Sequence, residues 1–261
     1  MFKWPGIPVD RLLACYAAAK AEHWEVVNPM IRRFDRIKAA LERYVTSGRV
    51  LDVGCFTGDF LAYLGPRWRP LGIEPGEAAA HRAKEQGIDI LGATIDGLVR
   101  YGPSGENLVD QRAAELDAVV SLDVLEHLVD PASMFRRVSA LLRRGGVFLA
   151  VTGDTDAVSW RLEGSLHWYC SLPEHVAFYN RTCMERAAAR HGMKSVAHER
   201  MSHKTYPVGR CLGQWVKNIG YVAMNRVGGL GIPTFRRWFI ERHAPIWTDI
   251  PDHMIHVMRK E

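Results

Sequence analysis

Two acids and two glycines in the first third of the chain are of the residue types that form a ligand site. Residues 50–61 read as a short apolar strand that contains Asp52, breaks at Gly54 and Gly58, and resumes as a helix. Such a unit brings backbone N–H groups and the positive end of a helix to one point, where a polar ligand group can bind. Glu74 ends the next apolar strand, close to the interval of about 20 residues at which α/β nucleotide sites place a ribose-binding acid.

The glycine turn lacks the residues of the common phosphate-binding loops. A dinucleotide fingerprint would need a second glycine where this chain has Phe56, and a P-loop would need a lysine where it has Asp59. Asp52, two positions before Gly54, would repel a pyrophosphate but attract an ammonium or sulfonium group. The turn therefore favours a ligand that carries a positive charge over a nucleoside phosphate.

Three histidines could remove a proton from an acceptor, because an imidazole titrates near neutral pH. His127 follows the fourth predicted strand, and His167 and His175 follow the fifth. Ligands bind at the carboxyl ends of the strands in open α/β sheets, so all three are candidate catalytic residues. The alternative for each is a histidine that is packed under aromatic side chains and stabilises the fold.

Strand and helix patterns alternate from residue 49 onward, which predicts parallel βαβ units with helices on both faces of one sheet. The predicted strands are 49–53, 69–73, 88–91, 117–121, 146–152, 193–201 and 253–259. The predicted helices of this part lie near 59–64, 76–86, 95–100, 131–143 and 180–191, and Gly145-Gly146 is expected to stop the fourth of them.

The remaining segments are predicted to be additions to one α/β domain. Residues 1–48 carry a helical pattern that Asn28-Pro29 divides, and they are expected to form an N-terminal cap on the core at 49–201. Residues 202–250 are too long for a loop and should contain helices around 208–226 and 233–242. Residues 251–261 hold the last strand of the core.

Composition is that of an ordinary globular protein, with 48% hydrophobic and 24% charged residues. No apolar run approaches the roughly 20 residues of a membrane span, and the N-terminus lacks the apolar core of a secretion signal, so a cytoplasmic location is expected. The five cysteines show no Cys-x-x-Cys pair, which favours reduced thiols.

The net charge of +5 is concentrated between residues 201 and 245, where seven lysines and arginines face the single acid Glu241. Trp215, Tyr221 and Trp238 interleave with these basic residues. Such a segment suits an anionic acceptor or peripheral contact with the inner face of an anionic membrane. The alternative is a cap whose aromatic side chains pack inward and whose charges are solvated.

Four motifs occur in order along the chain: Val50-Leu51-Asp52-Val53-Gly54-Cys55-x-x-Gly58, Gly72-Ile73-Glu74-Pro75, Leu116 to Pro131, and Leu142-x-x-Gly145-Gly146. Together they resemble the motifs of class I S-adenosylmethionine-dependent methyltransferases. The Leu125-Glu126-His127 segment is closest to the branch of the ubiquinone-biosynthesis O-methyltransferases. The resemblance is close over residues 49–152 and looser to 201, and it implies a Rossmann-like fold with a seven-stranded, mostly parallel sheet.

The resemblance also implies S-adenosylmethionine as cofactor and assigns residues to it. Asp52 would lie near the amino group, Glu74 would accept hydrogen bonds from both ribose hydroxyls, and Arg33 would reach the carboxylate although its spacing does not match. The full set of implied cofactor positions is Arg33, Asp52, Gly54, Cys55, Phe56, Gly58, Glu74, Pro75, Ile95, Asp96, Leu122 and Asp123. Singly, the glycines could be turn residues and the acids helix caps, but the order of the motifs favours the functional interpretation.

Two departures from the family pattern have consequences. Phe56 replaces the middle glycine of the turn, which must therefore avoid positive φ there or accept strain. Asp123 replaces a glutamate that, in the ubiquinone branch, can hold a divalent metal together with the positions of Glu126 and His127. Because the aspartate side chain is shorter, no metal is expected here.

The function that the resemblance implies is methyl transfer by in-line displacement to a small-molecule or glycan/lipid-precursor acceptor, with oxygen preferred over nitrogen. An RNA methyltransferase is an alternative that the basic, aromatic composition supports. Against nucleic acid, Ser121-Leu122-Asp123-Val124 stands where base-amino methyltransferases have Asn/Asp-Pro-Pro-Tyr. A non-catalytic S-adenosylmethionine-binding regulatory protein is the third alternative, for which Phe56 is the hint.

Overall fold

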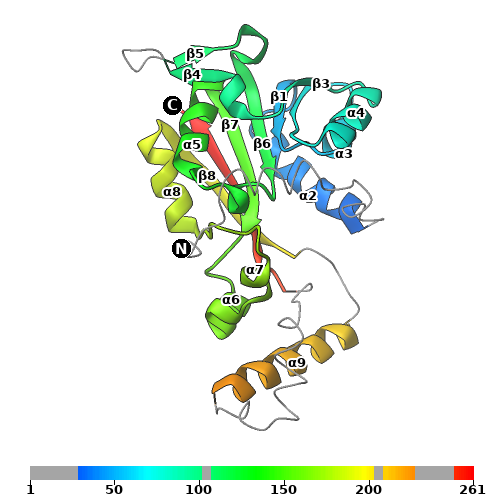
Figure 1. Cartoon of the computed structure of the whole chain (residues 1–261), viewed down its shortest axis with the longest axis vertical. Helices are drawn as coiled ribbons and strands as arrows, with labels where there is room; N and C mark the ends of the chain where they lie inside the picture. Colours follow the sequence, from blue (N-terminus) through cyan, green and yellow to red (C-terminus); the bar gives the residue numbers. More distant parts are fainter. Residues whose placement is uncertain (1–28, 102–106, 203–207, 227–249) are drawn as a thin grey trace.

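The computed structural model describes residues 29–101, 107–202, 208–226 and 250–261. Its centre is a seven-stranded sheet in the order β3-β2-β1-β6-β7-β9-β8 (Figure 1). The strands are β1 (Gly48–Val53), β2 (Trp68–Ile73), β3 (Asp89–Gly92), β6 (Leu116–Leu122), β7 (Leu142–Gly153), β8 (Met193–Met201) and β9 (His253–Lys260). β9 runs antiparallel to both of its neighbours, while the pairs from β3 through β7 are all parallel. The predicted Rossmann-like, mostly parallel sheet is confirmed.

Strand order reverses between β1 and β6, because the chain moves outward from β1 to β3 and then returns to the other side of β1. At such a switch point the connections leave in opposite directions and open a crevice at the carboxyl ends of the strands. The glycine turn follows β1 and Asp123 follows β6, so both predicted ligand segments lie at this crevice.

Helices cover both faces of the sheet, as predicted (Figure 1). α2 (Pro29–Glu42), α3 (Asp59–Leu64) and α4 (Glu77–Glu85) contribute Ile37, Leu61 and Ala83 to a core that includes Val50 of β1. α5 (Pro131–Leu141) and α8 (Arg181–Arg190) contribute to a second core that includes the next strand residue, Leu51. The split follows from the alternation of side chains along a strand.

Local sequence starts two of these helices. Asp130 caps α5 by accepting the N–H of Ser133 at 3.1 Å, with a proline at the first helical position, and Asn180 caps α8 by accepting the N–H of Cys183 at 2.9 Å. Such caps satisfy backbone donors that the helix itself cannot pair.

Two secondary-structure predictions are wrong. In place of a helix at 95–100 there is a 3-10 turn, η2 (Ile95–Gly97), and then β4 (Val99–Tyr101), which pairs antiparallel with β5 (Asn107–Val109). Val99 is β-branched and fully buried, and its burial in the strand overrides the helical pattern. Gly145-Gly146 does not stop a helix either: α5 ends at Leu141, and the glycines lie in β7, where the pairing with β6 shifts register and Gly145 has φ 76°.

After β7 the chain forms α6 (Val158–Glu163), η5 (Gly164–Leu166) and α7 (Trp168–Ser171), which the sequence did not predict. The predicted helix at 208–226 is α9 (Val208–Arg226), between β8 and β9. It lies beyond α6, away from the sheet (Figure 1).

The predicted helices before residue 29 and at 233–242 lie outside the described residues. No helix of the described ranges is both long and apolar enough to cross a membrane.

Candidate functional site

The turn after β1 needs its glycines for both conformation and space. Gly54 and Gly58 have φ of 81° and 84°. A Cβ at Gly54 would lie 2.6 Å from a methyl of Val124, and one at Gly58 would lie 2.8 Å from Ile88. Phe56 has φ 49°, so the turn accepts positive φ at this residue. The turn is thus pressed against the loop that follows β6.

Glu74 holds the turn in place from the end of β2. Its Oε2 accepts the N–H of Phe56 and its Oε1 accepts the N–H of Gly76, both at 2.8 Å. Burial raises the pKa of Glu74, while these two hydrogen bonds lower it. A carboxylate fixed in this way still offers further lone pairs on each oxygen, which is what recognition of two ribose hydroxyls requires.

Asp52 lies beneath the turn in β1 and is 2% exposed. Burial, reinforced by the nearby charge of Glu74, raises the pKa of Asp52 to about 8. Its Oδ1 is buried and accepts no hydrogen bond within the described residues. A buried acceptor in this state fits the ammonium group of a ligand, whose charge would also favour the ionised carboxylate.

The other predicted cofactor residues each have contacts of their own. Arg33 of α2 is buried and its Nη2 lies 2.6 Å from Oδ2 of Asp123, which has φ 55°. Asp96 forms an ion pair with Arg137 of α5. Ile95 packs against the core that includes Leu51, and Leu122 packs against the core that includes Val50. Cys55 is buried within the turn, and Pro75 directly follows Glu74.

The opposite side of the crevice is organised around Glu126, which is 1% exposed. Thr152 at the end of β7 donates to its Oε2 at 2.8 Å, and the hydroxyl of Tyr169 in α7 donates to its Oε1. Its backbone carbonyl accepts the N–H groups of Val176 and Ala177 at 2.8 and 3.0 Å. Burial raises the pKa of Glu126, and the charge of Asp123 raises it further. Glu126 therefore joins three segments on this side of the crevice, and we call this side the acceptor side and the side of Asp52 and Glu74 the cofactor side.

His127 and His175 have the same tautomer in the neutral form. Nδ1 of His127 lies 3.1 Å from the carbonyl oxygen of Glu174, and Nδ1 of His175 lies 3.0 Å from that of Tyr169. Because a carbonyl can only accept, each Nδ1 carries the proton and each Nε2 carries the lone pair. The ring centroids are 4.8 Å apart. Burial, with His127 alongside, lowers the pKa of His175 to about 3.

His167 belongs to an aromatic cluster. Its ring stacks on Trp160 at 4.3 Å, its Nε2 lies 3.2 Å from Oγ of Ser159, and its Nδ1 accepts the N–H of Tyr169. Burial lowers the pKa of His167 to about 3. Of the three histidines proposed from the sequence, His127 is the half-buried one, whereas His167 and His175 are buried.

The structure adds a pair that the sequence did not reveal, Asp252 and His253 at the start of β9. Oδ1 of Asp252 lies 2.7 Å from Nδ1 of His253, and its Oδ2 accepts the indole N–H of Trp168 at 3.2 Å. Burial lowers the pKa of His253, but the Asp252 carboxylate raises it, and the net shift is upward. His253 packs edge-on against Tyr169. The signal was available, since Asp252 directly precedes the predicted strand at 253–259 and His253 is its first residue.

The metal set that the resemblance would suggest does not fit this site. Within the described residues, the group whose ligand atoms lie within 4.8 Å of one another is Glu126, His127 and His175. Asp123 is not in that group, and its carboxylate is paired with Arg33. Both oxygens of Glu126 accept hydrogen bonds from protein hydroxyls.

Comparison with known families gives one matching model, that of a methyltransferase domain, over residues 29–198. A ubiquinone biosynthesis O-methyltransferase from Caulobacter vibrioides is 30% identical over 175 residues, which cover 57% of this chain and 64% of that protein. One from Methylocella silvestris is 39% identical over 111 residues, 40% of this chain and 39% of that protein. The chain thus spans less than two thirds of the length of these relatives.

Solved structures share the fold at low sequence identity. A methyltransferase from Thermotoga maritima, described as a possible histamine N-methyltransferase, superposes with a TM-score of 0.60 at 12% identity and covers 96% of this chain and 100% of its own. The N-methyltransferase NodS from Bradyrhizobium japonicum, in complex with S-adenosylhomocysteine, gives a TM-score of 0.57 at 15% identity, with 96% and 97% covered. These similarities support the fold alone.

Proposed function

The chain belongs to the class I S-adenosylmethionine-dependent methyltransferases, and on that premise we propose that it methylates an oxygen atom of a small-molecule or glycan/lipid-precursor acceptor. The observation that carries the proposal is the carboxylate of Glu74, fixed by two backbone N–H groups against the glycine turn, with the open acceptor of Asp52 beside it. These two acids match the ribose and ammonium groups of the cofactor.

When bound, the cofactor would supply a methyl group attached to a sulfonium. Transfer of the methyl group turns this sulfonium into a neutral thioether, which is the leaving group. The chain mainly orients and shields the reactants. Glu74 would hold the ribose of the cofactor and Asp52 the ammonium group of its methionine part, and the glycines would let the backbone approach it closely. On the other side, Nε2 of His127 is the proton acceptor for the attacking hydroxyl, since the carbonyl of Glu174 fixes its Nδ1–H.

Oxygen is preferred to nitrogen because the relatives of highest similarity reported above are named O-methyltransferases. The RNA alternative gains no support from the structure in the ranges described. The non-catalytic alternative rested on Phe56. That residue adopts the left-handed conformation usual for glycine and still donates its N–H to Glu74, so the departure leaves the turn intact.

The first test is calorimetry with S-adenosylmethionine and with S-adenosylhomocysteine. Binding of both is expected, and absence of binding to either would refute the proposal. The second test supplies methyl-labelled cofactor with lipid, glycan and RNA extracts as separate acceptors. Label in the lipid or glycan fraction is expected, whereas label retained on purified RNA would favour the alternative.

With an acceptor identified, His127→Gln tests the proton acceptor. A general base contributes about 10²–10⁴-fold, so kcat should fall by at least about a hundredfold while the affinity for S-adenosylhomocysteine stays the same. His167→Gln is the matched comparison and should act on stability rather than on the pH profile. An unchanged pH profile of kcat in His127→Gln would assign the proton to another group, and Asp252–His253 would be the next pair to test.

A further inference from the structure

Helix α9 exposes a row of large apolar side chains. Leu212, Val216 and Ile219 are 62%, 72% and 53% exposed. Their spacing of four and three residues places them in one line along the helix. Asn218 and Val222 are buried, and they lie about a quarter turn around the helix from this line. One side of the helix is therefore packed against the protein, while the apolar stripe is open to solvent.

The open stripe is part of a larger apolar end of the molecule. Of the six exposed large hydrophobic side chains within the described residues, five lie in α6, η5 or α9. Val158 of α6 and Leu166 of η5 add to the three of α9, and α6 contacts α9. Figure 1 shows both helices beyond the end of the sheet. Single exposed hydrophobic residues are ordinary, but a group at one end marks an interaction surface.

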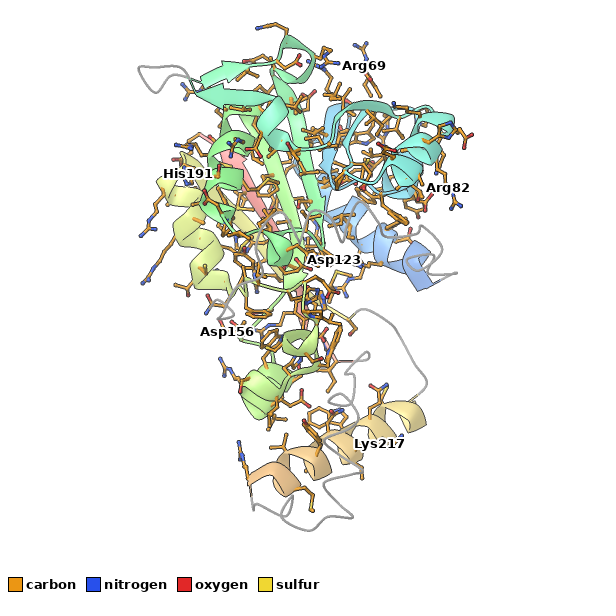
Figure 2. All side chains as sticks on the ribbon, viewed as in Figure 1. Arg69, Arg82, Asp123, Asp156, His191 and Lys217 are labelled. Carbon is orange, nitrogen blue, oxygen red and sulfur yellow. The ribbon has the colours of Figure 1, made fainter. Side chains whose placement is uncertain are left out.

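Charge on α9 indicates the kind of partner. The helix carries Arg210, Lys217 and Arg226 and no acid. Lys217, labelled in Figure 2, and Arg226 are exposed. An open apolar stripe on a helix whose charged residues are all cations complements an anionic bilayer surface, where the apolar side chains enter the acyl boundary and the long basic side chains reach the headgroups. Because α9 is not long and apolar enough to span a bilayer, it would lie in the interface plane.

We propose that α9 docks the protein on an anionic phospholipid membrane through Leu212, Val216 and Ile219, with Lys217 and Arg226 on the headgroups. The surface lies on the acceptor side, because α6, η5 and α7 follow the carboxyl end of β7, where Tyr169 meets Glu126. Docking there would turn the acceptor side of the crevice toward the lipid. The proposal goes beyond methyl transfer and does not depend on which acceptor is used.

Flotation with vesicles of phosphatidylcholine alone and of equal parts phosphatidylcholine and phosphatidylglycerol tests it. The full chain should float with the anionic vesicles at low salt and much less with the neutral ones. Leu212→Gln/Val216→Gln/Ile219→Gln removes the stripe without adding charge and should weaken binding at least about tenfold. Lys217→Gln/Arg226→Gln should weaken it about fivefold per cation and reduce its salt dependence.

Val129→Gln is the matched control, because Val129 is also exposed, at 49%, but lies in the loop before α5. It should float as the wild type does. Calorimetry with S-adenosylhomocysteine on every variant shows that the fold is intact and separates failure of this proposal from failure of the proposed function. Absence of wild-type binding to anionic vesicles overturns the proposal. So does a wild-type dimer in light scattering that the triple variant dissociates, since the stripe would then be a self-interface.

Discussion

The two sides of the crevice are built in different ways. On the cofactor side, Glu74 reaches back to Phe56 in the neighbouring turn, and Asp52, the glycine turn and Glu74 all lie within two strands and their connections. On the acceptor side, Glu126, Thr152 and Tyr169 meet from three elements, and His253 joins them from the last strand. The cofactor side is local in sequence and the acceptor side is assembled by the fold.

The two sides also differ in what their polar groups do. Asp52 keeps a buried oxygen without a hydrogen-bond donor in the described structure, and Glu74 has lone pairs to spare, so the cofactor side is prepared for a ligand. On the acceptor side, both carboxylate oxygens of Glu126 accept hydrogen bonds from protein hydroxyls, and burial lowers the pKa of His167 and His175 to about 3. Polar groups that are paired within the protein say little about the chemical groups of the acceptor, so the acceptor is harder to infer than the cofactor.

Trp160→Ala should have the largest effect and separate the two sides. Trp160 is 5% exposed and packs against His167 and Phe178. Its removal should lower the free energy of unfolding by about 3–5 kcal/mol in urea titration. At temperatures where the variant is folded, its affinity for S-adenosylhomocysteine should match the wild type. A large loss of affinity would show that the two sides are coupled.

Glu74→Gln should come next, with an effect confined to the cofactor side. Hydrogen bonds to a charged group contribute about 1.5–3 kcal/mol each, so losing the carboxylate should weaken S-adenosylhomocysteine binding by about a hundredfold in calorimetry. Glu77→Gln is the control, since Glu77 is exposed in the first turn of α4. Equal affinities of Glu74→Gln and wild type would remove Glu74 from the ribose site.

Asp52→Asn should change how stability depends on pH. The folded pKa of Asp52 is raised to about 8, so the folded state binds a proton that the unfolded state releases above its ordinary value of 3.8. The contribution of this group is present below about pH 4 and is lost as pH rises toward 8, with a slope of up to about 1.4 kcal/mol per pH unit. Urea unfolding over this range should show a flatter profile for Asp52→Asn. Identical profiles would mean that Asp52 is ionised in the fold.

Phe56→Gly should have the smallest effect. Glycine adopts the left-handed conformation without the strain of about 1 kcal/mol that phenylalanine bears there. This gain is offset by about 0.5–1 kcal/mol, because glycine is freer in the unfolded chain. The N–H to Glu74 remains, so cofactor affinity should change little. Phe56→Val, which is β-branched, should be clearly less stable in the same urea titration. If Phe56→Gly bound the cofactor much more weakly, the side chain itself would contact the ligand.

The features that the sequence predicted depend on neighbours in the chain, and the features that it missed depend on the fold. The seven strands and the glycine turn were predicted because apolar runs and glycines act through neighbours in the chain. The turn from Ile95, the β4–β5 hairpin and the bulge at Gly145 were not, because burial of Val99 and pairing with β6 override local preference. The segments at 10–28 and 233–242 stay predictions.

The sequence by itself determined the order of the strands along the chain and the family, since these depend on short motifs whose parts are close in sequence, and it predicted which residues meet the cofactor. Tertiary structure decided the protonation and the partners of the acceptor side. Only folding brings Tyr169 onto Glu126 and His253 onto Tyr169, and on the cofactor side only folding pairs Arg33 with Asp123. Burial lowers the pKa of His167 and His175, and burial is a property of the packed molecule rather than of any one segment.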